Sequence, residues 1–335
     1  MIYNLFIIIL IFNIIFFYFY QKIVKFINIY DKGDNIRKFQ KNPVPPLGGL
    51  LILLNIFLFF FISYIFFPNA INNIYFSSNR EILSFILGSI SFFFLGFYDD
   101  KYNLRPNIKF LTTLIFVLFF ILLDSNLLIK NITLSFLPNK IELNNFSYFF
   151  TPLCILLFLN ALNMFDGINL QVGFYVFFIF FIFFFKGIFI NISIIIMIGL
   201  TFFLILNNRN KIYMGDSGVF LLAYVISYII IKSYNYNYAF YADEIIAIML
   251  LPGIDMFRLF LIRLMRGSNP FKADMNHIHH LLSRFFNVKK SFLIIYFAIL
   301  SIVTLYYYIN FILLLLIVVF IYILSLILIS KTKFQ

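Results

Sequence analysis

Long apolar stretches recur along this 335-residue chain, and they constrain its fold more than any other feature. Of its residues, 63% are hydrophobic and 11% are charged, and the mean hydropathy is +1.01. Such stretches are typical of helices that cross a membrane, where backbone polar groups must be hydrogen-bonded within the segment. The sequence therefore predicts an all-α polytopic membrane protein with one integral membrane domain over residues 1–335.

Eleven stretches qualify as transmembrane helices, and ten is the alternative count because two pairs are barely separated, around Lys186-Gly187 and around Asn310. Residues 131–143 differ, since polar and apolar side chains alternate there on both sides of a turn at Leu137-Pro138-Asn139. That pattern predicts a small external β-hairpin. The expected helices cover residues 3–20, 47–67, 82–98, 108–123, 148–162, 171–186, 188–206, 218–232, 244–262, 291–309 and 311–330.

Basic residues concentrate on one side of the expected bundle. With the N-terminus outside, twenty of the 25 lysines and arginines fall in cytoplasmic segments. Cytoplasmic loops carry such an excess, so the sequence predicts an external N-terminus and a cytoplasmic C-terminus. Topology explains most of the net charge of +12, and nucleic-acid binding is not needed to account for it. The cytoplasmic segments expected to form a site are residues 21–46, 99–109, 163–170, 207–217 and 263–290.

Acidic residues gather at the cytoplasmic ends of the expected helices. Asp99 and Asp100 end a helix, where negative charge is unfavourable, so they need a compensating cation. Asp166 follows another helix, and Asp216 precedes a third, where it also suits a helix N-terminus. Carboxylate oxygens suit Mg²⁺, which is usually held by one or two carboxylates together with substrate phosphates. Such clusters beside basic residues predict metal-assisted phosphoryl transfer.

All three histidines lie within four positions, as His277-Ile278-His279-His280. They follow Arg266 and Asp274 in the last large cytoplasmic loop. Histidine binds metals and phosphates and changes its charge near neutrality. A chain that uses histidine nowhere else is therefore expected to mark a functional site here, rather than a solvated loop.

Short motifs of polar residues, glycines and prolines follow one another along the chain. They are Asp31-Lys32 through Arg37-Lys38, Pro45-Pro46-Leu47-Gly48-Gly49, Gly96 to Asp100, Asn160 to Gly167, Met214 to Gly218, Pro252-Gly253-Ile254-Asp255 and Pro270 to Leu282. In this order, the motifs resemble those of the polyprenyl-phosphate N-acetylhexosamine-1-phosphate transferases, glycosyltransferase family 4. The resemblance runs from about residue 31 to 284. The Ala-Asp-x-x-His-x-His-His form of the last motif is similar to the branch that starts O-antigen, enterobacterial common antigen and teichoic-acid lipid intermediates.

The resemblance implies transfer of a sugar-1-phosphate from a UDP-N-acetylhexosamine to undecaprenyl phosphate, giving undecaprenyl-diphospho-sugar and UMP. This would be the first membrane step of cell-envelope polysaccharide synthesis. It further implies Mg²⁺ as the cofactor, with Mn²⁺ as the alternative ion, and a homodimer in the bacterial inner membrane whose site faces the cytoplasm. Two alternatives stay open: the phospho-N-acetylmuramoyl-pentapeptide transferase of peptidoglycan synthesis, and a membrane transporter of an anionic substrate.

The resemblance also implies roles for individual residues. Asp99 would be the base that deprotonates the lipid phosphate, or the nucleophile of a two-step scheme. Asp100 and Asp216 would hold the metal, and Asn163 and Asp166 would support the metal–diphosphate centre. The residues expected to act in catalysis are Asp99, Asp100 and Asp166. The residues expected to bind substrate are Asn163, Tyr213 (stacked on the nucleotide base), Lys109, Arg266, His277, His279, His280, Lys32, Arg37 and Lys38.

Three positions depart from the family pattern. Asn169 stands where a second acid associated with base recognition is usual, and Val219 stands where serine is usual. The usual histidine after the Arg-Lys pair is replaced near Gln40. Because the acids expected to hold the metal are retained, an active enzyme is expected, with the donor preference left open.

Overall fold

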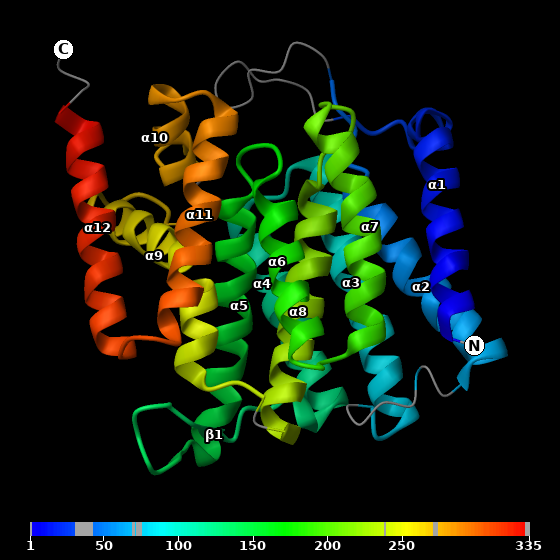
Figure 1. The fold of residues 1–335 in the computed structure, drawn as a ribbon, viewed down its shortest axis with the longest axis horizontal. Coiled ribbons are helices and arrows are strands. Elements are labelled where there is room, and N and C mark those ends of the chain that lie inside the picture. Colours follow the sequence, from blue (N-terminus) through cyan, green and yellow to red (C-terminus); the bar gives the residue numbers. More distant parts are fainter. Residues whose placement is uncertain are drawn as a thin grey trace.

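The apolar stretches form long helices that run between the two ends of a bundle in the computed structural model (Figure 1). The structure describes residues 2–30, 43–68, 71, 76–237, 239–270 and 274–331. Its elements are α1 (Ile2–Ile27), α2 (Gly48–Phe66), α3 (Asn79–Tyr102), α4 (Pro106–Leu123), η2 (Ser125–Leu127), β1 (Asn131–Ile132), β2 (Ile141–Glu142), η3 (Asn144–Phe146), α5 (Ser147–Phe165), α6 (Gln171–Phe185), α7 (Ile190–Asn208), α8 (Gly215–Asn237), α9 (Ala242–Met265), α10 (Ile278–Phe285), α11 (Val288–Tyr306) and α12 (Phe311–Lys331).

Ten of the described helices are long and apolar enough to cross a membrane. The expected sixth span, α6, has only 15 residues, because the chain turns at Lys186 and at Gly187, whose φ is +74°. The prediction of an all-α, multi-pass membrane protein is confirmed. The first described helix starts at one end of the bundle and α12 finishes at the other (Figure 1).

A small hairpin lies at the end of the bundle away from α10 (Figure 1). Its strands β1 and β2 are antiparallel, with Asn131 opposite Glu142 and Ile132 opposite Ile141, so the predicted hairpin is confirmed. The buried carboxylate of Asp243, at the start of α9, accepts hydrogen bonds from the backbone N–H and the hydroxyl of Ser135. Because a buried charge needs such donors, this contact fixes the hairpin to the helices.

Helix α8 forms the centre of the bundle, and its apolar segment is entirely buried. Its most extensive contact is with α3. At the hairpin end, the ammonium of Lys232 on α8 is fully buried and lies 3.0 Å from both the Glu81 and the Asp124 carboxylates. A buried charge without partners would be very unfavourable, so this cluster holds α3, α8 and the segment after α4 in one arrangement.

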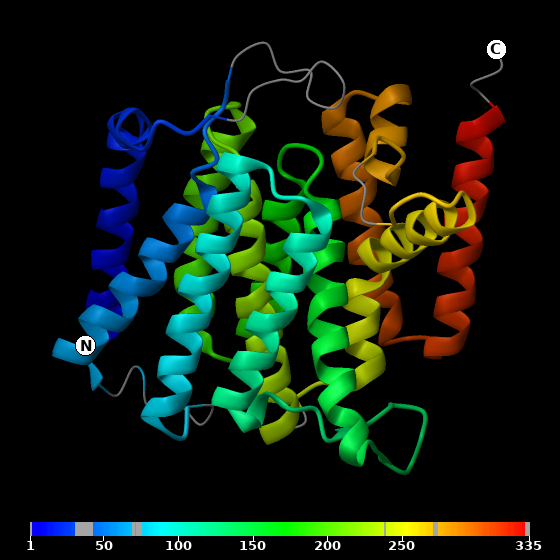
Figure 2. The same cartoon turned by 180° about the vertical axis from the view of Figure 1, so that it is seen from behind.

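Helix α9 bends. Its first half runs along the bundle, and its second half turns across it towards α12 (Figure 2). Pro252 lies inside this helix. Proline lacks the N–H that the helix would use and clashes with the preceding turn, so it explains the bend. The bend carries Asp255 and the residues after it to the end of the bundle where α10 lies.

Candidate active site

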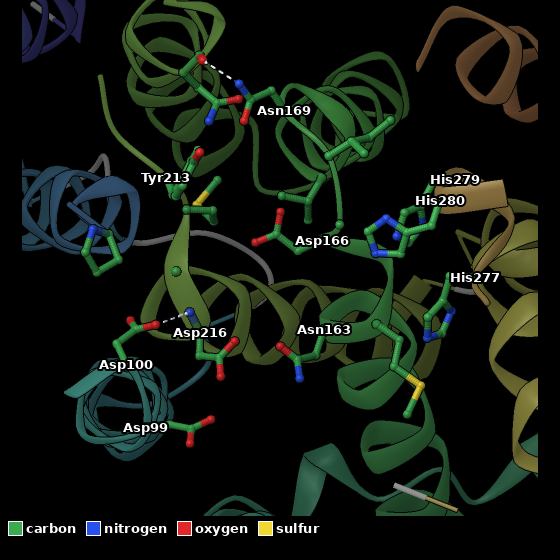
Figure 3. Close-up of a pocket in the computed structure, with 18 of the residues that line it drawn as sticks. Asp99, Asp100, Asn163, Asp166, Asn169, Tyr213, Asp216, His277, His279 and His280 are labelled. Carbon is green, nitrogen blue, oxygen red and sulfur yellow. Dashed lines mark hydrogen bonds between the residues drawn. The ribbon is translucent and has the colours of Figure 1, made fainter. Parts of the chain in front are cut away.

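A cavity of about 860 Å³ opens at the end of the bundle opposite the hairpin. Acidic side chains and histidines face each other across it, with Asn163 and Asp166 between them (Figure 3). The cavity brings together residues that the sequence scatters over five segments. Ten of the predicted site residues line it: Asp99, Asp100, Lys109, Asn163, Asp166, Tyr213, Asp216, His277, His279 and His280.

Two carboxylates in the cavity share one cation. The Lys109 ammonium on α4 lies 2.5 Å from Asp99 Oδ2 on α3 and 2.8 Å from Asp216 Oδ2 on α8. With its amide nitrogen turned towards Asp216, Asn163 on α5 donates to that carboxylate over 2.9 Å and accepts from Lys109 over 3.2 Å. Four helices therefore converge on one charged centre. Lys109 is the compensating cation that Asp99, at the end of α3, requires.

Asp100 makes a different contact. Its Oδ1 accepts the Asp216 N–H over 2.8 Å, and its Oδ2 accepts the Ser217 N–H over 3.1 Å. These N–H groups belong to the first turn of α8, where the helix has unpaired donors and partial positive charge. The contact offsets the negative charge of Asp100 and fixes the start of α8, and thus Asp216, against the end of α3.

Glycines make this close approach possible. A Cβ on Gly96 of α3 would lie 2.3 Å from the carbonyl oxygen of Asp216, and a Cβ on Gly49 of α2 would lie 2.4 Å from the backbone nitrogen of Gly218. Real Cβ atoms do not approach backbone atoms so closely. Three of the sequence motifs therefore meet through backbone contacts at the start of α8.

Tyr213 occupies a position fixed by its backbone. Its N–H donates to the Pro45 carbonyl over 3.0 Å, and its carbonyl accepts the Gly48 N–H over 2.9 Å. The Pro45–Gly49 motif thus holds the segment before α8 in a short extended pairing. This pairing places Tyr213 among the residues that line the cavity, as expected for a residue that contacts a ligand there.

The three histidines form a packed group at the start of α10, where His277 is the residue that precedes the helix. The rings of His277 and His279 are stacked, with centroids 5.5 Å apart and an interplanar angle of 3°. His279 is fully buried, and a Cβ on Gly167 would lie 1.8 Å from its Nε2, so only glycine fits there. Burial, followed by the neighbouring charges of His277 and Arg284, lowers the pKa of His280 to about 4. Burial also lowers the pKa of His279 well below its usual value, so both rings are neutral at pH 7.

Asparagines line another part of the cavity. The side-chain amide of Asn169 donates to the Asn207 carbonyl over 3.3 Å and to the side chain of Asn210. Asn207 in turn accepts the Leu170 N–H over 2.7 Å. The residue that departs from the family pattern is therefore part of a neutral amide network. Sequence reasoning missed Asn207 and Asn210, because single asparagines carry no signal in a chain rich in them.

One predicted residue in the described part of the chain, Arg266, is not among those that line the main cavity. Arg266 lines a separate cavity of about 380 Å³, together with Arg258 and Arg263, because α9 bends away before it. The predictions for Lys32, Arg37 and Lys38 concern positions outside the described residues. Conversely, Lys289 at the start of α11 lines the main cavity and was not predicted, since a lysine at a helix start is common.

The site can hold a cation between carboxylates and can bind anionic groups near Lys109 and the histidines. Carboxylate and amide oxygens are the ligands that Mg²⁺ prefers. Among the residues that the structure describes, no group of three or more His, Cys, Asp or Glu side chains is arranged to hold a metal ion by itself.

Comparison with known proteins supports the resemblance. Residues 82–234 match the family described as glycosyl transferase family 4. Over 303 residues, the chain is 26% identical to an undecaprenyl-phosphate alpha-N-acetylglucosaminyl 1-phosphate transferase of Escherichia coli O157:H7, covering 87% of this chain and 79% of the relative. It is 26% identical over 277 residues to a probable undecaprenyl-phosphate N-acetylglucosaminyl 1-phosphate transferase of Bacillus subtilis, covering 79% and 73%. The resemblance to this family, and to relatives named as N-acetylglucosaminyl 1-phosphate transferases, is confirmed.

Proposed function

We propose that this chain, which carries the pattern of glycosyl transferase family 4 over residues 82–234, transfers a sugar-1-phosphate from a UDP-N-acetylhexosamine to undecaprenyl phosphate. An oxygen of the lipid phosphate would attack the β-phosphorus of the donor. The bond between that phosphorus and the bridging oxygen would break, and UMP would leave. The convergence of Asp99, Asp216 and Lys109 in one cavity with the histidines carries this proposal.

Asp99 is the group best placed to act on the acceptor. Its carboxylate already contacts an ammonium, the kind of group that would also attract the lipid phosphate. As a base, it would take the proton of the phosphate before the attack. In the two-step alternative, it would attack the β-phosphorus itself, expel UMP and form an acyl phosphate. An oxygen of the lipid phosphate would then attack that phosphorus and release the Asp99 carboxylate. Both schemes use the same position of Asp99.

The side chains of Asp99 and Asp216 would suit a divalent cation that took the place of the Lys109 ammonium, on which both now converge. A Mg²⁺ ion bound by such carboxylates and the diphosphate would neutralise charge on the transferred group. Asp100 supports the arrangement by holding the start of α8. Its oxygens keep further lone pairs, so it stays a candidate ligand as well.

The remaining lining residues suit the rest of the donor. His279 and His280 are neutral, so they would act as hydrogen-bonding groups towards the sugar and phosphates rather than as cations. Tyr213 would stack on the uracil base. Lysine and arginine are in excess in the segments expected on the cytoplasmic side, which favours a cavity that opens to the cytoplasm from the bacterial inner membrane. Sugar nucleotides dissolved in the cytosol would reach such a cavity.

An assay in membranes tests the proposal. Membranes containing the protein, undecaprenyl phosphate and Mg²⁺ are supplied with a panel of UDP-sugars that includes UDP-N-acetylmuramoyl-pentapeptide. We expect UMP release with an N-acetylhexosamine donor. The variants Asp99→Asn and Asp216→Asn should lower the rate by at least roughly 100-fold, because each removes charge at the reacting centre. The control Glu142→Gln changes an exposed acid on β2 and should keep the rate.

The same assay distinguishes the alternatives. Release with only the muramoyl-pentapeptide donor would move the chain to the peptidoglycan branch. Uptake of the donor into sealed vesicles without a lipid-linked product would indicate a transporter. If no donor releases UMP, or if both acid variants react as fast as the unaltered protein, the proposal is wrong.

A further inference from the structure

A buried carboxylate behind the histidines receives four hydrogen bonds. Asp255 is 3% exposed. Its Oδ2 accepts from His277 Nδ1 over 2.8 Å, and its Oδ1 accepts from the Tyr322 hydroxyl over 2.6 Å. The same Oδ1 accepts from the Arg258 guanidinium over 2.9 Å and from the Ile278 N–H over 3.1 Å. One carboxylate thereby joins α9, the start of α10 and α12.

The proton positions in this network follow from its donors. Arg258 Nε can only donate, and it donates to the Tyr322 hydroxyl over 2.7 Å. The single proton of that hydroxyl is therefore available for Asp255. Because Arg258 is permanently charged and three donors point at Oδ1, the carboxylate is ionised and can only accept. The ring nitrogen Nδ1 of His277 must consequently carry a proton.

The hydrogen bond between His277 and Asp255 determines which ring nitrogen of His277 a ligand in the cavity can reach. Because Nδ1 donates to Asp255, the ring nitrogen left for a ligand is Nε2. No described residue makes a hydrogen bond to Nε2. His277 lines the cavity across from Asp99 (Figure 3). A histidine whose second nitrogen is held by a carboxylate has a fixed tautomer and a fixed ring orientation.

We propose that Asp255 and Tyr322 are positioning residues that fix His277 with Nδ1 protonated and with the lone pair of Nε2 directed at a hydroxyl group of the donor sugar. The identity of this ligand rests on the proposed function, whereas the state of the ring does not. Tyr322 lies on α12, beyond residues 82–234 that match the family. The hydroxyl of Tyr322 thus connects α12 to the site. Arg258 also holds the loop before His277, because it donates to the Asn276 carbonyl over 2.6 Å.

The first test reads the ring directly. Because the chain has only three histidines, nitrogen-15 labelling of histidine gives spectra of this site alone. The His277 signals are those missing from His277→Gln. We expect Nδ1 of His277 to be protonated in the unaltered protein and to lose this preference in Asp255→Asn. An unprotonated Nδ1 in the unaltered protein, or an unchanged spectrum of His277 in Asp255→Asn, would overturn the proposal.

The second test separates positioning from a general structural role. Tyr322→Phe should lower the rate of UMP release roughly tenfold, a loss typical when the orienting partner of a functional histidine is removed. In a His277→Gln background, the same substitution should have no further effect, because its partner is gone. The control Tyr308→Phe, at an 85% exposed tyrosine, should keep the rate. Additive losses in the double variant would contradict positioning through His277.

The two tests also separate this inference from the proposed function. If no donor releases UMP but Nδ1 of His277 is protonated as described, the proposed reaction fails while the positioning of the ring stands. If UMP is released and the double variant is additive, the reaction stands and the positioning role is wrong.

Discussion

Replacing Gly96 with alanine should move the two halves of the acidic centre apart. The new Cβ would lie 2.3 Å from the Asp216 carbonyl oxygen and 2.4 Å from the Ser217 nitrogen. Ordinary contact begins near 3.4 Å, so α3 and the start of α8 must separate by about 1 Å. A displacement of this size in a reacting centre lowers the rate by roughly 100-fold. Overpacking of this kind also destabilises the fold by about 1–3 kcal/mol.

The matched control is Gly253→Ala, because a Cβ at this helical glycine would meet nothing within 4 Å. Purified variants would be compared by thermal denaturation and by UMP release well below the temperature of unfolding. Gly96→Ala should then be folded but slow, and Gly253→Ala should react like the unaltered protein. A Gly96→Ala variant that is folded and fully active would refute the argument that glycine is needed for the distance between Asp99 and Asp216.

Three further outcomes are expected. Lys232→Met leaves two buried carboxylates without their cation, so the free energy of unfolding should fall by about 3–5 kcal/mol. Thermal denaturation should show a lower midpoint for Lys232→Met but not for the control Lys130→Met, which changes an exposed lysine. Equal midpoints in the two variants would contradict this prediction. Lys109→Met should lower UMP release at least roughly 100-fold while the protein stays folded, and a retained rate would argue against the shared cation. Because the pKa of His280 is lowered to about 4 in the folded state, the unfolded state takes up its proton first as the pH falls below about 6.5. The free energy of unfolding should therefore fall as the pH is lowered from 7 to 5, and it should fall less steeply in His280→Gln than in the unaltered protein. An equal pH dependence in both proteins would count against the burial of this ring.

The helices and the hairpin could be predicted because their signals are local. An apolar run of sufficient length forms a helix in a membrane whatever its neighbours are, and alternation around a turn forms a hairpin. The ends of the helices were less predictable. Helix α1 continues to Ile27, beyond the apolar run that ends at residue 20, because polar side chains can extend a helix into water.

The site was predictable as a set of residue types but not as a network of contacts. Lys109 was expected to bind phosphate, whereas its place between Asp99 and Asp216 depends on how α3, α4 and α8 pack. Pro252 could indicate a bend, but the direction in which α9 continues depends on α11 and α12. For this reason, Arg266 was expected in the main cavity and lines another, and Tyr322 was not considered at all.

The central claim concerns which bond of the donor breaks, and a donor with a radioactive β-phosphate tests it most directly. The purified protein would be incubated with undecaprenyl phosphate, Mg²⁺ and the labelled UDP-N-acetylhexosamine that supports the fastest release. We predict that all transferred label enters the lipid fraction, with an equal amount of unlabelled UMP in the water. Label recovered as UDP would mean that the sugar alone was transferred, and this result would contradict the account.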